Sequence, residues 1–144
     1  SRQDFQMDTR QLRSIEEILR QSKVIAVVGL SPREERDSHR VAAYLQKQGY
    51  RIIPVNPIAD EILGEPCYAS VGDIPDEIDI VDIFRRSKDV PQVVDETIRK
   101  GADVIWMQMG IVNEAAAKKA KEHGIEVVMD RCMLVEHEYW KSGR

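Results

Sequence analysis

Three amphipathic segments of this chain each end at a glycine, and a short apolar run follows each glycine. The segments cover residues 40–48, 89–100 and 113–123, and the glycines are Gly49, Gly101 and Gly124. Glycine is favoured just past a helix C-terminus, and apolar residues three or four positions apart are typical of a helix with one buried face. This repetition predicts helices that alternate with strands, and it restricts the fold more than any other feature of the sequence.

The apolar runs are rich in β-branched residues and occupy residues 23–28, 51–55, 78–84, 104–107 and 126–129. Continuous runs of this length are typical of strands covered on both faces, as in a parallel sheet. The alternation predicts an α/β fold: a single Rossmann-like, doubly wound parallel sheet of five or six strands with helices on both faces. The sixth strand is predicted as a short edge strand near Cys67 and Tyr68.

The chain has 144 residues, which predicts one domain over 1–144. Residues 1–8 are expected to form a flexible tail, and residues 9–21 an amphipathic helix. A short terminal helix is expected over 133–140, and Asn113 is well placed to cap the helix that follows it. His123 and His137 lie near helix ends and are interpreted as surface residues, whereas Trp106 is interpreted as a core residue.

Composition excludes several classes of function. The formal net charge is −4, from 21 basic and 25 acidic residues, with no basic stripe, so nucleic-acid binding is not expected. No apolar run approaches the roughly 18 residues that cross a bilayer, and no signal peptide begins at Ser1, so a cytoplasmic location without membrane contact is expected. Cys67 and Cys132 match no metal-ligand spacing, and no metal site is predicted.

A ligand of a doubly wound sheet binds at the carboxyl ends of the strands, where the strand order reverses. Here the loops on either side of that point are predicted to be Gly29-Leu30-Ser31-Pro32 and Phe84-Arg85-Arg86-Ser87. The first loop is small and leads to a helix N-terminus. The second carries two guanidinium groups suited to bidentate phosphate contacts. Together they predict a phosphorylated ligand.

Two features argue against a nicotinamide dinucleotide. The fingerprint G-x-G-x-x-G needs three glycines, and only Gly29 is present in this loop. An NAD site also expects an acidic residue at the end of the second strand to bind the ribose hydroxyl, and this chain has Asn56 and then Pro57. A neutral residue there tolerates a phosphorylated ribose better than a carboxylate does.

Seven ordered segments carry a resemblance to a known family. They are I-A-V-V-G-L-S-P (25–32), S-H-R-V-A-A-Y-L (38–45), G-Y-R-I-I-P-V-N-P (49–57), E-I-L-G-E-P-C-Y (61–68), D-I-V-D-I-F-R-R-S (79–87), W-M-Q-M-G-I (106–111) and M-D-R-C (129–132). In this order, over about residues 9–138, the chain resembles the small coenzyme A-binding protein family. That family is related to the N-terminal coenzyme A-binding domain of the succinyl-CoA synthetase α subunit.

The resemblance implies that coenzyme A, or an acyl-CoA, is held on the strand ends by its nucleotide. Residues 29–32 would approach the pyrophosphate near Ser38, residues 55–57 would border the adenosine, and residues 84–86 would line the opposite wall. Met109 stands where the synthetase carries an acid before a glycine. The implied binding residues are Gly29, Leu30, Ser31, Pro32, Ser38, Arg40, Val55, Asn56, Pro57, Phe84, Arg85, Arg86, Met109, Gly110, Ile111 and Cys132.

Each of these residues also has a structural interpretation. Gly29 serves equally as the turn that leaves a central strand, and Asn56 with Pro57 as plain turn chemistry. The two arginines suit a solvated pair beside acidic residues, and Ser38 suits a helix cap. His39 is interpreted as a surface residue in preference to a ligand contact.

Cys132 has two interpretations, of which an inert buried thiol is preferred. It follows Asp130 and Arg131 after the last strand, at the same edge of the sheet as the predicted site. Arg131 would favour the thiolate, and a mixed disulfide with the thiol of coenzyme A is the second interpretation.

Three functions of different classes follow. The first is a coenzyme A-binding module that acts as a carrier, sensor or regulatory partner, favoured because no catalytic constellation is found and because the phosphohistidine domain of the synthetase has no counterpart in this sequence. The second is a nicotinamide-dependent oxidoreductase. The third is a ligand-free interaction subunit. No protein partner or homo-oligomer is indicated by the sequence.

Overall fold

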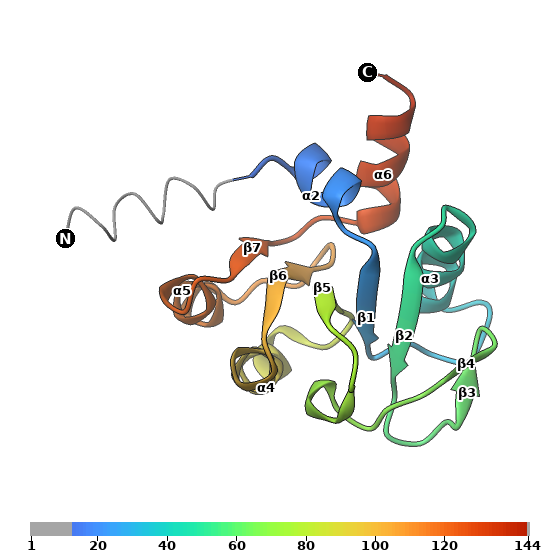
Figure 1. The fold of residues 1–144 in the computed structure, drawn as a ribbon, viewed down its shortest axis with the longest axis horizontal. Helices are drawn as coiled ribbons and strands as arrows, with labels where there is room; N and C mark the ends of the chain where they lie inside the picture. Colours follow the sequence, from blue (N-terminus) through green and yellow to red (C-terminus); the bar gives the residue numbers. More distant parts are fainter. Residues whose placement is uncertain (1–12, 144) are drawn as a thin grey trace.

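The computed structural model describes residues 13–143, and its centre is one parallel sheet (Figure 1). The sheet order is β2-β1-β5-β6-β7. The strands are β1 (Val24–Val28), β2 (Arg51–Val55), β5 (Ile78–Ile83), β6 (Ala102–Met107) and β7 (Glu126–Val128). All four neighbouring pairs are parallel, so the predicted doubly wound α/β fold is confirmed.

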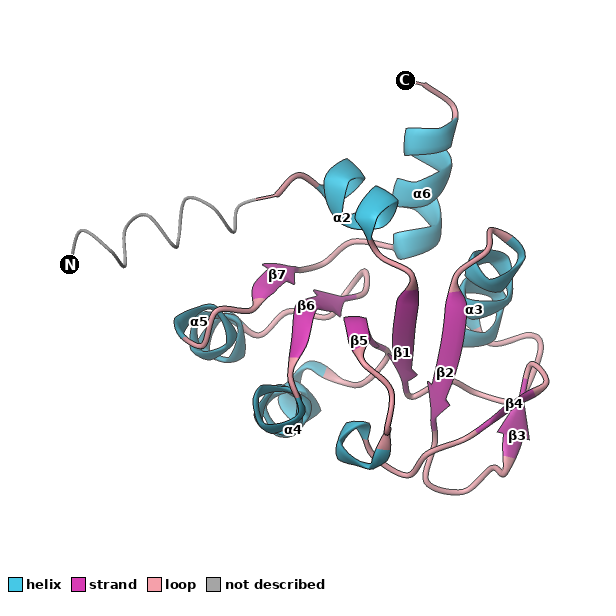
Figure 2. Cartoon of the chain, in the orientation of Figure 1, coloured by secondary structure: helices cyan, strands magenta, loops and turns pink. Residues whose placement is uncertain are grey.

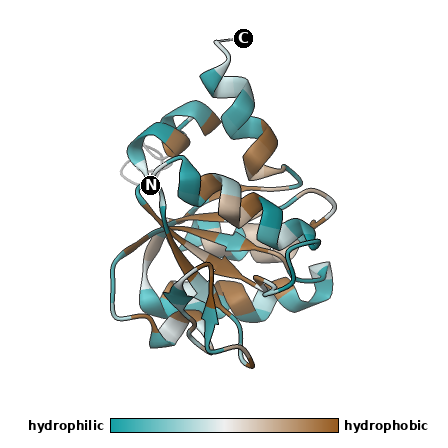
Figure 3. Cartoon of the chain, turned by 90° about the vertical axis from the view of Figure 1, so that its right-hand side faces the viewer, coloured by the Kyte–Doolittle hydropathy of each residue, from teal (hydrophilic) through white to brown (hydrophobic). Residues whose placement is uncertain are grey.

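Helices cover both faces of the sheet (Figure 2). On one face lie α4 (Val90–Lys100) and α5 (Glu114–Glu122), and on the other α2 (Ile15–Gln21), α3 (Asp37–Lys47) and α6 (Met133–Lys141). Successive strand residues point to opposite faces, so Val28 and Ile83 pack towards α4, whereas Val27 and Trp106 pack towards α3 and α6. In Figure 3 the central strands are accordingly mostly brown, the apolar colour.

The predicted helix ends agree with the structure to within a few residues. The three helices end at Lys47, Lys100 and Glu122, each followed within two residues by its predicted glycine. The Oδ1 atom of Asn113 accepts a hydrogen bond from the N–H of Ala116 at 3.0 Å, which confirms the predicted cap.

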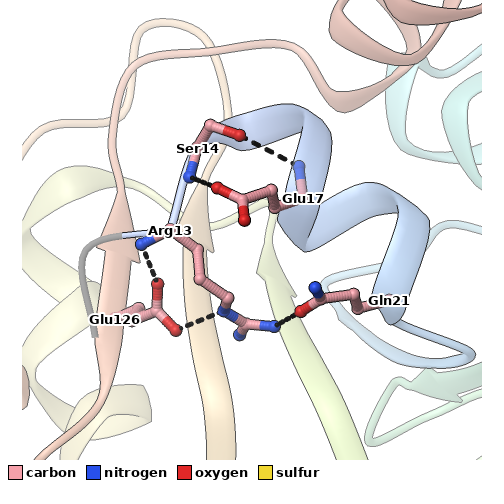
Figure 4. A network of polar contacts seen from close by, with 5 residues as sticks. All are labelled: Arg13, Ser14, Glu17, Gln21 and Glu126. Carbon is pink, nitrogen blue, oxygen red and sulfur yellow. Dashed lines mark hydrogen bonds and ion pairs between the residues drawn. The ribbon is translucent and has the colours of Figure 1, made fainter. Parts of the chain in front are cut away.

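Within the described residues, the helix predicted over 9–21 is present only from Ile15. It begins at Ile15, so residues 13 and 14 are not helical, and residues 1–12 lie outside the described part of the chain. Ser14 and Glu17 form a capping box, which fixes the start of α2. Arg13 instead binds β7, because its N–H and Nε atoms donate to the Glu126 carboxylate at 3.1 and 2.7 Å (Figure 4).

The prediction that His137 lies on the surface is wrong, whereas Trp106 is fully buried as predicted. The helix α6 packs against α3, which places His137 among the rings of Tyr44, Tyr50 and Trp140. The His137 Nδ1 atom lies 2.8 Å from the Tyr44 hydroxyl oxygen. Burial lowers the pKa of His137.

The expected sixth strand is a single bridge. Tyr68 pairs in parallel with Val55, through bonds from Tyr68 N–H to Pro54 O (3.0 Å) and from Asn56 N–H to Tyr68 O (2.9 Å). The preceding segment forms a separate two-stranded hairpin of β3 (Glu61–Ile62) and β4 (Glu65–Pro66), and a short 3-10 helix η1 (Val71–Asp73) follows.

The strand order reverses between β1 and β5, as predicted, and the two strands are in close contact where β1 ends. Phe84 N–H donates to Val28 O at 2.8 Å, and Gly29 N–H donates to Val55 O at 3.0 Å. Gly29 has φ +82°, and a Cβ atom at this position would lie 2.2 Å from the Phe84 carbonyl oxygen. Both the backbone angle and the neighbouring strand therefore require glycine.

Gly29→Ala should be much more destabilising than Gly64→Ala. Both glycines have positive φ, but a Cβ at Gly64 meets nothing within 4 Å. Gly64→Ala should cost about 1–2 kcal/mol for the left-handed backbone alone. Gly29→Ala adds a clash with backbone and should cost roughly 2 kcal/mol more. Urea denaturation of both variants measures the difference, and equal costs would show that the contact with Phe84 is not a constraint.

Candidate functional site

The loop after β1 is held by the first turn of α3. Ser31 N–H donates to the Ser38 hydroxyl at 3.0 Å, and the Ser31 carbonyl lies 2.9 Å from His39 Nδ1. A carbonyl oxygen only accepts hydrogen bonds, so this contact assigns the proton of a neutral His39 to Nδ1 and leaves Nε2 as an acceptor. The Ser31 hydroxyl in turn accepts from Arg33 N–H at 3.1 Å. These contacts fix the loop as a rigid part of the site.

One of the structural interpretations for this region is wrong. Ser38 does not cap α3, whose N-cap position is Arg36 and carries no side-chain cap. Ser38 is 6 % exposed because its hydroxyl turns inward to the Ser31 amide. His39 is half-buried and bonds to the same loop, so both of its interpretations stay predictions.

Asn56 joins the loop after β2 to the loop after β1. Its Nδ2 atom donates to the Leu30 carbonyl at 3.0 Å. Its Oδ1 atom accepts the N–H groups of Ile58 and Ala59 at 2.8 and 2.9 Å, an Asx turn. The Asn56 side chain therefore positions backbone, while Pro57 beside it is exposed.

The two arginines after β5 have different surroundings. Arg86 is exposed, and its Nε atom lies 3.4 Å from the Asp89 carboxylate, as in the solvated-pair interpretation. Arg85 is half-buried, and none of the ion pairs between described residues involves it. Arg85 is thus a half-buried cation at this edge that remains available to an anionic or aromatic group.

A hollow of about 270 Å³ opens beside Arg85, between α4 and the loop that precedes η1. Of the predicted site residues, only Val55 and Arg85 line it. The complete lining is Val28, Val55, Ala69, Ser70, Arg85, Asp89, Gln92, Val93 and Glu96.

Sequence reasoning missed the part of this lining that comes from α4 and its N-cap residue, Asp89. Gln92, Val93 and Glu96 lie three, four and seven positions after Asp89, which is the spacing of one helix face. This segment begins three residues after Arg86, and its spacing was the signal that the sequence offered. Ser70 had none, because a tertiary contact with α4 brings its loop to the site.

Arg40, predicted to bind the ligand, is bound to its own loop. Its guanidinium contacts the Asp37 carboxylate and donates to the Glu35 carbonyl at 2.9 Å. These contacts brace the charged segment 33–37, which separates β1 from α3.

Residues 109–111 lie after β6, at the same edge of the sheet. Met109 is 64 % exposed, and Gly110 N–H donates to the Asp130 carboxylate at 2.7 Å, which ties this loop to the loop after β7. Neither Met109 nor Gly110 lines the hollow beside Arg85.

Cys132 occupies the N-cap position of α6 and is half-buried. It packs on the apolar cluster that includes Phe84, so it lies on the α3 and α6 side of the sheet. Arg131 Nη1 lies 3.6 Å from the Glu136 carboxylate. Both interpretations of Cys132 stay predictions.

A buried carboxyl lies just below the site. Asp82 is fully buried in β5 between Val27 and Trp106, and its Oδ1 atom accepts a 2.7 Å bond from Gln108 Nε2. Its Oδ2 atom has no hydrogen-bond partner in the part of the chain that the structure describes. Burial raises the pKa of Asp82 to about 7, against the opposing effect of the Gln108 bond. Gln108 Oε1 also accepts the Met133 N–H at 3.3 Å, so this group links β5 to the start of α6.

Asp82→Asn should reduce the dependence of stability on pH. The folded state favours protonated Asp82. The contribution of this carboxyl to the free energy of unfolding is therefore complete below about pH 4 and decreases as the pH rises towards 7. From pH 5 to pH 8 the wild-type chain should lose about 2–3 kcal/mol more of its unfolding free energy than the variant does. Urea denaturation at both pH values measures this.

Asp95→Asn is the matched control. Its exposed carboxyl has a pKa lowered by the hydrogen bond from Lys119, so it stays ionised from pH 5 to pH 8. The Asp95 variant should lose as much unfolding free energy between pH 5 and pH 8 as the wild type does. If the Asp82 variant also loses the same amount, the raised pKa of Asp82 is contradicted.

No helix within residues 13–143 is long and apolar enough to span a membrane. Within the same residues, no three His, Cys, Asp or Glu side chains are grouped so as to hold a metal ion.

Comparison with known proteins gives consistent matches. The family model described as "CoA binding domain" matches residues 23–138. The uncharacterized protein YneT of Bacillus subtilis (strain 168) is 50% identical over 123 residues, which is 85% of this chain and 91% of that protein. A solved structure of a hypothetical protein from Pyrococcus horikoshii OT3 has a TM-score of 0.85 at 45% identity, and covers 91% of this chain and 94% of that chain.

A much longer relative matches over one part only. Acetate--CoA ligase [ADP-forming] I of Archaeoglobus fulgidus is 35% identical over 121 residues, which is 77% of this chain but 18% of the ligase.

Proposed function

This chain belongs to the CoA-binding domain family, and on that premise we propose that it binds coenzyme A or an acyl-CoA across the carboxyl ends of β1, β2 and β5. The observation that carries this proposal is the half-buried, unpaired Arg85 beside a hollow at the point where the strand order reverses. Ligands of such sheets bind at this point, and a guanidinium there suits a phosphorylated nucleotide.

The loop after β1 supports the placement of the pyrophosphate. Gly29 lets the backbone pass close to β5, and the bonds to Ser38 and His39 hold the next residues in one conformation. A preorganised loop loses little conformational entropy when an anion binds. The neutral Asn56 at the end of β2 places no carboxylate against a phosphorylated ribose.

We propose a binding role, as carrier, sensor or regulatory module. The polar side chains of Ser31, Ser38, His39 and Asn56 are all used to hold loop backbone. The ligase of Archaeoglobus fulgidus acts on acetate and coenzyme A by its name, and this chain corresponds to 18% of it. The shared part therefore fits the binding of coenzyme A better than the complete ligation.

Coenzyme A should raise the melting temperature of the purified chain, after removal of any coenzyme A carried from the host. At 100 times its dissociation constant, a ligand of the native state adds about 2.7 kcal/mol. For a domain of this size the midpoint should rise by about 5–10 °C. Acetyl-CoA should act similarly, and NAD and NADP should not.

A shift with NAD or NADP in place of coenzyme A would support an oxidoreductase instead. If none of these compounds shifts the midpoint, the chain is better described as a ligand-free interaction subunit.

Arg85→Ala should weaken coenzyme A binding on the order of 10-fold, because a charge-assisted contact is worth about 1.5–3 kcal/mol. Arg86→Ala is the matched control: it removes the same charge at the next position, where the guanidinium is exposed and paired with Asp89. Its affinity should change less than about 3-fold, since exposed pairs contribute little. Calorimetric titration measures both, and equal losses would contradict the separate role of Arg85.

A further inference from the structure

We propose that the buried carboxyl of Asp82 couples ligand binding at the carboxyl edge to the uptake of a proton, so that coenzyme A binds more tightly as the pH falls. This inference rests on the proposed function, because it concerns the regulation of the same site. Asp82 is the second-last residue of β5, and Arg85 follows it by three positions. The carboxyl therefore lies about 10 Å of extended chain from the cation proposed to bind the ligand.

The surroundings of Asp82 are dry. It is paired in register with Val27 of β1 and Trp106 of β6, and all three residues are 0 % exposed. The first residue of α6, Met133, is also 0 % exposed. An ionised carboxylate at this position loses its hydration, which favours the protonated form.

Little in the protein compensates the lost hydration. The Asp82 Oδ1 atom accepts one hydrogen bond, from Gln108 Nε2, whereas Oδ2 has no partner within residues 13–143. None of the ion pairs between these residues involves Asp82. The pKa of Asp82, raised to about 7 by this burial, agrees with the geometry. Near neutral pH the carboxyl is therefore divided between its two forms, and a small change in its surroundings alters its charge.

Other titratable groups do not bind Asp82. Its side chain points to the same face of the sheet as that of Ile80, towards α2, α3 and α6. The buried or half-buried titratable side chains of these helices and their flanking residues are Arg13, Glu17, His39, Tyr44, Tyr50, Cys132, Glu136 and His137. No hydrogen bond or ion pair joins any of them to Asp82, whose one partner in the described part of the chain is Gln108.

Gln108 connects the buried carboxyl to the edge where the ligand is proposed to bind. Its amide donates to Asp82 through Nε2 and accepts the Met133 N–H at 3.3 Å through Oε1. The three segments joined in this way continue into the loops of residues 84–86 and 109–111 and come from the loop of residues 130–132. An anion bound by these loops thus acts on Asp82 through closely packed protein, where water screens the interaction weakly.

The direction of the coupling follows from the charges. A bound phosphate adds a negative charge above Asp82 and neutralises the unpaired guanidinium of Arg85. A single negative charge at about 10 Å, with an effective dielectric constant of about 20, strengthens proton binding to a carboxyl roughly 10-fold. By linkage, coenzyme A should then bind about 5-fold more tightly at pH 6 than at pH 8 through Asp82 alone.

Proton uptake on binding tests this coupling directly. Calorimetric titration of the whole chain with coenzyme A at pH 7, in buffers of different ionisation enthalpy, counts the protons taken up. The wild type should take up about 0.4 proton more than Asp82→Asn, which keeps the shape of the side chain but does not titrate. The phosphates of coenzyme A also titrate, but they are the same in both titrations, so the difference belongs to Asp82.

Asp95→Asn is the matched control. It removes a carboxylate that binds Lys119 on the far side of α4, so it makes the same change in net charge. Its proton uptake should equal that of the wild type. Melting temperatures should show that both variants are folded.

A second measurement needs no variant. An NMR titration of the side-chain carboxyl carbons of the wild type, with and without coenzyme A, follows Asp82 itself. The titration midpoint of Asp82 should move to higher pH when coenzyme A is bound. An unchanged midpoint would overturn the coupling even if Asp82→Asn failed to fold.

The outcomes separate the two proposals. If coenzyme A does not bind the wild type at any pH from 6 to 8, the proposed function is wrong and the coupling with it. If coenzyme A binds but the wild type and Asp82→Asn take up the same number of protons, only the coupling is wrong.

Discussion

The approach of β1 to β5 at Gly29 is the constraint on which the site depends. At this position the two central strands are so close that even a methyl group would overlap the Phe84 carbonyl. The loop after β1 then turns towards α3, and the chain after β5 turns towards α4. Because these two segments turn to opposite faces of the sheet, the carboxyl edge beside Arg85 stays open, and the hollow lies there.

The edge divides into two parts with different chemistry. On the α3 side, polar side chains such as Ser38 and Asn56 bond to backbone and hold the loops still. On the α4 side, Arg85 and Glu96 line a hollow of mixed polar and apolar side chains and have no ion-pair partner among residues 13–143. The α3 side therefore presents fixed backbone to a ligand, and the α4 side presents an unpaired guanidinium.

The sequence predicted the elements well because their signals are local. Glycines after helices, Asn113 before α5 and continuous β-branched runs each act within a few residues, and their order places the crevice between β1 and β5. The errors concern contacts between distant segments. Residues 13 and 14, predicted as helical, lie before α2 because Ser14 caps it and Arg13 binds β7, and His137 is buried because α6 packs on α3. Likewise, no local pattern brings Ser70 to α4.

The bond between Arg13 and Glu126 joins residues 113 positions apart, and α2 also contacts α6, the last helix. Contacts of such separation form late in folding, after the intervening loop closes. Other contacts of α2 are made by earlier parts of the chain, such as the 2.6 Å bond from the Tyr50 hydroxyl to the Leu19 carbonyl. During translation these can form first, whereas the contacts with β7 and α6 need the last strand and helix. A stalled nascent chain that lacks Glu126 should therefore hold α2 by only part of its contacts and leave some of its apolar face exposed.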